Sequence, residues 1–182
     1  MTGPGIAFRP LIREDFPLLS QWLSAPHVRA WWREDPAAGA VEERYGPVVD
    51  GSDPTEIFVI ERGGQPIGII QRYRFADNPG WREVMSGAGA PSEAAGIDYF
   101  IGLQDIIGAG IGPQAIDLFV GETWDRYPDV VAVVASVQDG NRRSWRALEK
   151  IGFRRAWTGE LASDDPSDAG ISHVYVRDRP VQ

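Results

Sequence analysis

Four glycines lie close together where an apolar strand-like segment gives way to a helix-like one, between residues 94–102 and 112–127. They are Gly102, Gly108, Gly110 and Gly112. Backbone N–H groups at such a junction point outward at the helix N-terminus, where the helix dipole favours an anion such as phosphate. A glycine-rich turn that only permits tight packing has the same pattern. The loop is therefore a candidate phosphate cradle, with tight packing as the alternative.

Two common nucleotide-binding patterns do not fit this loop. A Walker loop needs Lys and then Ser or Thr after its last glycine, whereas Pro113 and Gln114 follow here. A dinucleotide fingerprint reads G-x-G-x-x-G near the first strand, with an acidic residue about twenty residues later. This loop reads G-x-G-x-G and lies late in the chain. Neither mode of nucleotide binding is predicted.

A second group of residues with chemical potential begins at Asn141. The segment 141–152, NRRSWRALEKIG, has an Asn in the N-cap position and Gly152 after its end. Its apolar residues Trp145, Leu148 and Ile151 fall on one helical face. The sequence predicts a helix directly after a buried strand at 130–137.

Hydrophobic periodicity predicts the elements that position these residues. Strands are expected at 6–11, 56–63, 65–75, 94–102, 130–137, 153–161 and 171–178. Helices are expected at 13–24, 26–32, 37–49, 112–127 and 141–152. Segment 76–93 is expected to be a long polar loop. The order predicts a single α/β domain spanning residues 1–182.

Composition limits the function classes. The net charge of −8 opposes nucleic-acid binding and is compatible with a cationic small-molecule partner. With no Cys and two His, we expect no disulfide, no thiolate nucleophile and no metal. The N-terminus lacks the pattern of a secretory signal, and the longest apolar run, 130–137, is too short to span a bilayer. We expect a cytoplasmic monomer or homodimer with no membrane partner.

The glycine loop and the Asn141 helix together resemble the GNAT superfamily of acyl-CoA-dependent N-acyltransferases. In that superfamily a (Q/R)-x-x-G-x-(G/A) loop binds the CoA pyrophosphate, and an Asn in N-x-x-A-x-x-x-Y-x-x-x-G-F faces the pantetheine arm. Residues 105–110, DIIGAG, match the loop, and residues 141–153 match the second pattern. The resemblance implies acetyl-CoA as cosubstrate, no metal, and a mixed, splayed central sheet flanked by helices. The implied CoA-binding residues are Ile101, Gly108, Ala109, Gly110, Ile111, Gly112, Pro113, Asn141 and Ser144.

Within the superfamily, the chain is most similar to the aminoglycoside 6'-N-acetyltransferases. The matching pieces include QWLSAPHVRAWW, PIGIIQRYRF, GIDYFIG and NRRSWRALEKIGF. This resemblance implies acetyl transfer to a primary amine of a cationic small molecule, the 6'-amine of an aminoglycoside, and a role in antibiotic resistance. It places Asp98 beside the amine as the catalytic residue. The implied acceptor-binding residues are Trp31, Trp32, Tyr45, Gln71, Tyr73 and Asp98.

The chemistry of amine acylation agrees with a carboxylate at Asp98. The enzyme must hold the ammonium, remove a proton and place the nitrogen against the carbonyl carbon. A carboxylate on a central strand can do the first and assist the second. Because the thioester is already activated, direct attack through a tetrahedral intermediate needs no protein nucleophile. We expect a backbone N–H within 100–102 to polarise the thioester carbonyl.

Three positions depart from the superfamily pattern. The Tyr that protonates the leaving thiolate is replaced by Leu148, and the first loop residue, Gln or Arg in relatives, is Asp105. An acidic residue that relatives carry five positions before the helix Asn is Ser136 here. Another proton donor, or unaided departure of the thiolate, must then replace the Tyr, and one acceptor-binding carboxylate is missing from its usual place.

Alternatives remain on the acceptor side. Adjacent tryptophans such as Trp31 and Trp32 are commonly one core anchor and one partly exposed ring, and Tyr73 fits a core strand residue equally well. An enzyme that acylates a siderophore hydroxylamine, a polyamine or a peptide would share every CoA-side residue. A non-catalytic acyl-CoA-binding sensor is compatible with Leu148.

Overall fold

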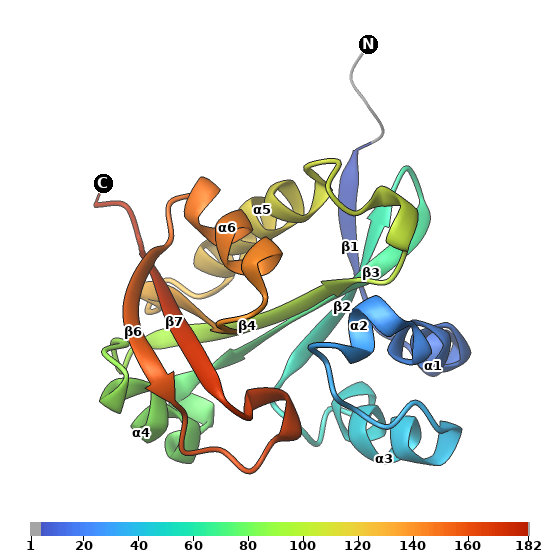
Figure 1. The fold of residues 1–182 in the computed structure, drawn as a ribbon, viewed down its shortest axis with the longest axis horizontal. Helices are drawn as coiled ribbons and strands as arrows, with labels where there is room; N and C mark the ends of the chain where they lie inside the picture. The colour runs from blue at the N-terminus through green and yellow to red at the C-terminus, as the bar shows by residue number, and fades with distance from the viewer. Residues whose placement is uncertain (1–4, 182) are drawn as a thin grey trace. The chain divides into compact units, whose positions relative to one another are not determined.

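The computed structural model describes residues 5–181 and contains one mixed sheet, whose strands are labelled in Figure 1 with the helices. The strands are β1 (Ile6–Pro10), β2 (Glu56–Arg62), β3 (Gln65–Arg74), β4 (Ala94–Ile101), β5 (Ala132–Gln138), β6 (Arg154–Glu160) and β7 (Ile171–Asp178). Their order in the sheet is β1-β2-β3-β4-β5-β7-β6. All seven predicted strands are confirmed, each with ends within two residues of the expected ones. The prediction that no secretory signal is present rests partly on residues 1–4, which lie outside the described residues.

Six α-helices and four short 3-10 turns connect the described strands. The helices are α1 (Phe16–Ser24), α2 (Pro26–Arg29), α3 (Ala38–Val49), α4 (Pro79–Gly87), α5 (Ile111–Arg126) and α6 (Arg142–Lys150). The 3-10 turns are η1 (Arg13–Asp15), η2 (Phe75–Asp77), η3 (Gln104–Ile106) and η4 (Pro166–Asp168). In residues 5–181, no helix combines the length and apolar character needed to cross a membrane.

The segment 76–93 corrects one prediction, because it contains helix α4 instead of a long polar loop. Pro79 begins the helix after Asn78, and Met85 is 1% exposed within a cluster that includes Trp81 and Ala88. These apolar residues recur at helical spacing along the segment. The polar residues and glycines between them obscured that spacing in the sequence.

The contacts of the chain divide it into two compact units. The first comprises Met1–Gln71 and Tyr99–Gly112, and the second comprises Arg72–Asp98 and Pro113–Gln182. In the first unit, β1 pairs with β2 in antiparallel register from Ile6↔Arg62 to Pro10↔Phe58. Its core includes Leu19, Leu23, Tyr45, Val59 and Ile69, all without exposed surface.

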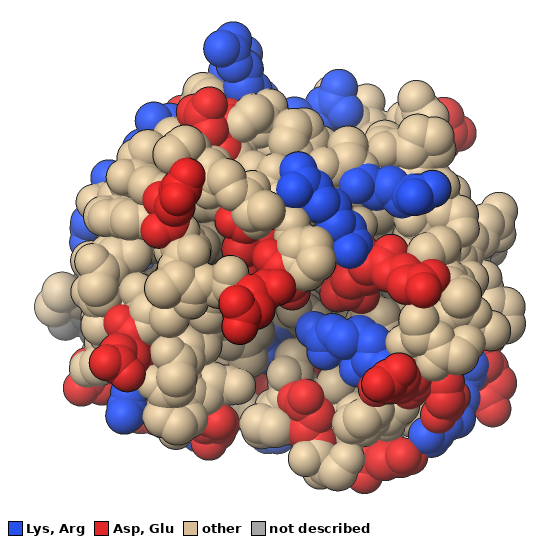
Figure 2. All heavy atoms as spheres, turned by 60° about the horizontal axis from the view of Figure 1, so that its bottom comes forward, with Lys and Arg blue, Asp and Glu red and all other residues tan. Residues whose placement is uncertain are grey.

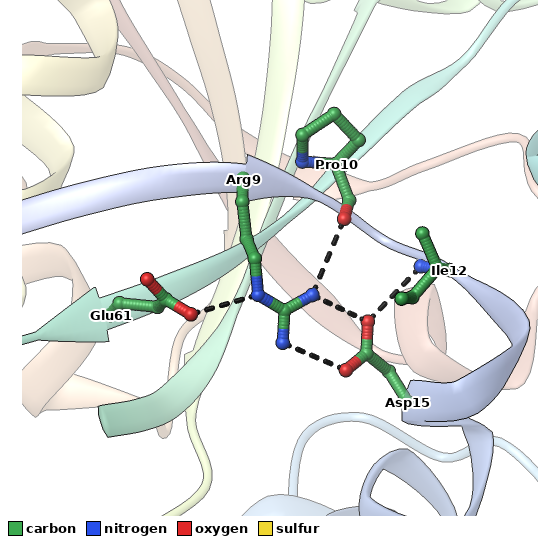
Figure 3. A network of polar contacts seen from close by, with 5 residues as sticks. All are labelled: Arg9, Pro10, Ile12, Asp15 and Glu61. Carbon is green, nitrogen blue, oxygen red and sulfur yellow. Dashed lines mark hydrogen bonds and ion pairs between the residues drawn. The ribbon is translucent and has the colours of Figure 1, made fainter. Parts of the chain in front are cut away.

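A polar network fixes the start of the first unit (Figure 3). Arg9 on β1 donates two hydrogen bonds to Asp15, at 2.7 and 2.8 Å, and one to Glu61 on β2 at 2.8 Å. The backbone N–H of Ile12 also donates to Asp15, at 3.1 Å. Burial opposes ionisation of Asp15, but the hydrogen bonds from Arg9 and Ile12 outweigh it and lower the pKa of the carboxyl. The network joins the first strand to the turn that leads into α1.

In the second unit, β5 pairs with β7 in antiparallel register over its full length, and β6 pairs with the other side of β7. The β4–β5 ladder is parallel and covers only residues 94–96 against 132–134. A ladder confined to the first part of β4 agrees with the splayed sheet that the superfamily resemblance implies. Met85 of α4 packs in one cluster with Val134 and Val174.

Candidate functional site

The four glycines of the sequence pattern lie on the path from the end of β4 to the start of α5, and they serve two different purposes. Gly108 and Gly110 have φ of +91° and +79°, a left-handed conformation that side chains rarely adopt. A Cβ added at Gly108, Gly110 or Gly112 would meet no atom within 4 Å, so these three glycines are not required for packing. Gly102 differs, because a Cβ there would overlap the indole of Trp22.

This geometry favours anion binding over the packing alternative at residues 108–112. Helix α5 begins at Ile111, and the first N–H groups of a helix have no partner within it. With the helix dipole they form a site for an anion. Asp105 lies exposed in η3, before this loop.

Asn141 caps α6, as predicted. Its side-chain Oδ1 accepts the backbone N–H of Ser144 at 3.3 Å, and its own N–H donates to the carbonyl of Gln138 at 2.9 Å. The side-chain amide NH₂ of Asn141 is the group left to meet a ligand. Leu148, further along the helix, is fully buried and has no proton to donate.

Asp98 and Tyr73 are brought together in the second unit. Asp98 lies on β4, half-buried, and shares a hydrogen bond with the phenol of Tyr73 on β3. Trp81 of α4 donates its indole N–H to the Tyr73 hydroxyl at 3.2 Å. A Cβ at Gly96 would overlap the Tyr73 ring, so glycine lets the ring lie against β4.

The environment of Tyr73 keeps its phenol protonated. Burial raises the pKa of Tyr73 well above its usual value, and the negative charge of Asp98 raises it further. A protonated phenol beside an ionised carboxylate donates its hydrogen bond. Tyr73 therefore orients the Asp98 carboxylate.

Asp168 in η4 is a residue that sequence reasoning missed. Its charge adds to the rise in the pKa of Tyr73. Burial raises the pKa of Asp168 itself, against a 2.6 Å hydrogen bond that Ser163 donates to it. The sequence indicated only that an acidic residue of the relatives is missing at the position of Ser136. Nothing in the sequence spacing connects Asp168, in a loop, with Tyr73, on a strand.

The predicted acceptor residues of the first unit have different positions. Trp31 is 36% exposed, whereas Trp32 packs edge-on against Phe100 at 5.1 Å between ring centroids. One exposed ring and one anchored ring is the division expected for adjacent tryptophans. Gln71 is 5% exposed.

Tyr45, predicted to bind the acceptor, is buried in the first unit. Its side chain has no exposed surface, and its hydroxyl donates to Glu34 at 2.6 Å. Burial first, and then the charge of Glu34, raises the pKa of Tyr45 well above its usual value. Glu34, the partner of the Tyr45 hydroxyl, is a residue that the sequence did not single out.

The hydrogen bonds near Gly102 bear on which backbone N–H could polarise the thioester carbonyl of acetyl-CoA. The N–H of Gly102 donates to the carbonyl of Ile67 at 2.8 Å, so it is not available to a ligand. The carbonyl of Ile101 accepts a hydrogen bond from Nε2 of His27 at 3.0 Å. Gly102 is therefore excluded from the range 100–102 expected to polarise the thioester carbonyl.

The charged side chains on the surface and the side chains able to bind a metal are both dispersed in the part of the chain that the structure describes. Figure 2 shows basic and acidic side chains interspersed on the face in view, without a patch of one sign. Over residues 5–181, no three His, Cys, Asp or Glu side chains lie together as they would around a metal ion.

Comparison with known proteins connects these features. The acetyltransferase (GNAT) domain family matches residues 12–161. An aminoglycoside N(6')-acetyltransferase type 1 from Klebsiella pneumoniae is 27% identical over 161 residues, covering 86% of this chain and 78% of that protein.

Solved structures show the same architecture. Aminoglycoside acetyltransferase AAC(6')-Ib in complex with coenzyme A is 25% identical, with a TM-score of 0.80 over 96% of this chain and 95% of that one. A chimera of spermidine N-acetyltransferase SpeG from Vibrio cholerae and hSSAT, at 15% identity and a TM-score of 0.70, covers 95% of both chains and shares the fold.

Proposed function

The chain belongs to the GNAT acetyltransferase family, and on this premise we propose that it transfers an acetyl group from acetyl-CoA to the 6'-amine of an aminoglycoside. Similarity to aminoglycoside N(6')-acetyltransferases over most of the chain supports this acceptor. The observation that carries the proposal is the Asp98 carboxylate hydrogen-bonded to a protonated Tyr73. The proposal includes a role in antibiotic resistance and a cytoplasmic location, where acetyl-CoA is available.

On the donor side, the backbone N–H groups of Gly108, Gly110, Ile111 and Gly112 hold the anionic end of acetyl-CoA. The N–H of Ala109 already donates to the carbonyl of Ile106 at 3.3 Å, and Pro113 has no N–H. Open space above Gly108 and Gly110 supports this role, since a phosphate must approach the backbone closely there. The amide NH₂ of Asn141 donates to the pantetheine arm, and Ser144 supports the cap. Acetyl-CoA supplies an activated thioester.

On the acceptor side, Asp98 holds the ammonium by charge and accepts a proton from it, which frees the nitrogen lone pair to bond to the carbonyl carbon. The tetrahedral intermediate breaks its C–S bond to release the thiolate, and the second proton on nitrogen passes to solvent. Tyr73 keeps its proton and fixes the carboxylate in place. Because Leu148 has no proton to donate, the thiolate leaves without help from that position. A thiol pKa of about 8.5 makes the thiolate a tolerable leaving group near neutral pH.

Release of free CoA thiol, measured with a panel of aminoglycosides, tests the proposal. Turnover is expected with compounds that carry a 6'-amine and not with 6'-hydroxyl analogues. Turnover restricted to polyamines or peptides would replace the acceptor, and CoA binding without turnover on any amine would establish a sensor.

Asp98→Asn tests the assigned base. We expect kcat to fall by about 10²–10⁴-fold, the range typical for loss of general base catalysis, while CoA affinity stays within twofold. The exposed Asp178→Asn is the matched control, and it should leave both quantities unchanged. An Asp98→Asn enzyme with a wild-type rate would remove Asp98 from catalysis.

A further inference from the structure

A buried histidine in the second unit has no role in the reaction described so far. His173 on β7 is 3% exposed and lies edge-on to the rings of Trp145 and Tyr175, at 6.2 and 6.3 Å. Its Nδ1 is 2.8 Å from the hydroxyl of Thr158 on β6. Its Nε2 is 2.9 Å from a carboxylate oxygen of Asp139.

The chemistry of Asp139 and Thr158 indicates which nitrogen of the His173 ring carries a proton. A carboxylate offers no proton, so the contact with Asp139 is favourable only when Nε2 of His173 carries one. In the neutral ring, Nδ1 then accepts a hydrogen bond from the hydroxyl of Thr158. The contact with Asp139 is short but bent away from hydrogen-bond geometry, so its attraction is mainly electrostatic.

Asp139 opens the turn that leads to the α6 cap. Its N–H donates to the carbonyl of Ile171 at 2.9 Å, and its carbonyl accepts the indole N–H of Trp145 at 3.1 Å. Two residues later, the N–H of Asn141 closes the turn on the carbonyl of Gln138. Asp139 is thus fixed through its backbone on two sides and through its side chain on a third.

We propose that His173 is a positioning residue for acetyl-CoA, which acts by holding Asp139 and thereby the turn that presents Asn141. The inference rests on the proposed function, in which Asn141 meets the pantetheine arm. Asp139 is exposed, so without His173 its carboxylate would turn into water, and the turn would lose this side-chain contact with β7. Acetyl-CoA affinity would fall, and the acceptor chemistry at Asp98 would be unaffected.

Three substitutions at position 173 separate positioning from packing. His173→Leu removes both polar contacts and keeps an apolar side chain of similar size. His173→Gln places an amide near the former Nε2 and can still donate to Asp139, whereas His173→Asn places it near the former Nδ1 and reaches only Thr158. We expect His173→Leu and His173→Asn to raise the KM for acetyl-CoA about three- to fivefold, the effect of losing a contact with a partly exposed charge. His173→Gln should restore it to within about twofold.

The kinetic readout distinguishes this role from general destabilisation. In all three variants, kcat at saturating acetyl-CoA and the KM for the amine should stay within twofold of wild type. Equal loss in every parameter, or wild-type KM for acetyl-CoA in His173→Leu, would overturn the proposal.

Asp139→Ala gives the same test from an exposed position, where folding of the core is not at risk, and Asp178→Ala is its matched control. Asp139→Ala should raise the KM for acetyl-CoA as His173→Leu does, and the double variant should be no worse than either single one. Additive effects would show that the two residues act independently and would overturn the proposal.

Calorimetric titration of CoA into wild type separates failure of the inference from failure of the proposed function. If wild type does not bind CoA, the proposed function is wrong and the inference falls with it. If wild type binds CoA and the variants bind it equally well, only the inference is wrong.

Discussion

Tyr73→Phe removes one hydroxyl and leaves the aromatic ring that Gly96 accommodates. In wild type the hydroxyl is hydrogen-bonded to Asp98 and accepts the indole N–H of Trp81 at 3.2 Å. A hydrogen bond to a charged group contributes about 1.5–3 kcal/mol, so we expect kcat/KM for the amine to fall by about 10- to 100-fold. The KM for acetyl-CoA should not change.

The pH dependence of kcat/KM in Tyr73→Phe gives a second, independent test of the hydrogen bond between Tyr73 and Asp98. A hydrogen bond donated to a carboxylate favours its charged form, so losing the donor makes Asp98 easier to protonate. The acidic limb of the kcat/KM profile should therefore move to higher pH. The assay is thiol release from pH 4.5 to pH 9, with an aminoglycoside as acceptor.

Trp81→Phe is the comparison variant, because it removes the indole donor and keeps the phenol of Tyr73 on Asp98. Its effect should be less than about tenfold, the size of one neutral hydrogen bond. The reasoning would be refuted if Tyr73→Phe left kcat/KM and the acidic limb as in wild type. It would also be refuted if Trp81→Phe cost more than Tyr73→Phe.

Two further substitutions test the loop and the network at the start of the chain. Gly110→Ala forces a side chain into φ of +79° at a cost of about 1–2 kcal/mol and should raise the KM for acetyl-CoA, whereas Gly121→Ala, in open space on α5, should not. Arg9→Leu should lower the free energy of unfolding at pH 7 by about 1–3 kcal/mol in urea titrations, because it removes both side-chain donors of Asp15 and leaves only the N–H of Ile12. The lowered pKa of Asp15 gives wild type stability above the unfolded pKa of about 3.9 that is lost as pH falls through the folded value, so the two proteins should converge near pH 2–3. A gap of constant size down to pH 2 would contradict this account.

Local signals in the sequence were sufficient for the strands and the caps. The apolar run that became β5 and the Asn141 cap of α6 each depend on residues adjacent in the chain. Helix α4 was missed because its start is an Asn-Pro pair and its apolar residues are spaced among glycines and charges.

The site was only partly predictable, because its partners come from distant segments. Nothing in the sequence spacing pairs Asp139 with His173, because they meet only through the sheet order that places β7 beside β5. Nothing in the spacing pairs Asp168 with Tyr73 either. Tyr45 was assigned to the acceptor side from a matching sequence, which does not reveal that its hydroxyl is already bound to Glu34.

The missing side chain at Gly96 also constrains how this protein can change over generations. Any larger residue there would collide with the ring of Tyr73 and push its hydroxyl away from Asp98. A smaller residue at position 73 would make room for such a change but would abandon the phenol. The two positions must therefore vary together, and in an alignment of relatives we expect a bulky residue at one to accompany a small residue at the other. A search for altered acceptor range by single substitutions would pass over such variants, whereas a library that randomises positions 73 and 96 together would contain them.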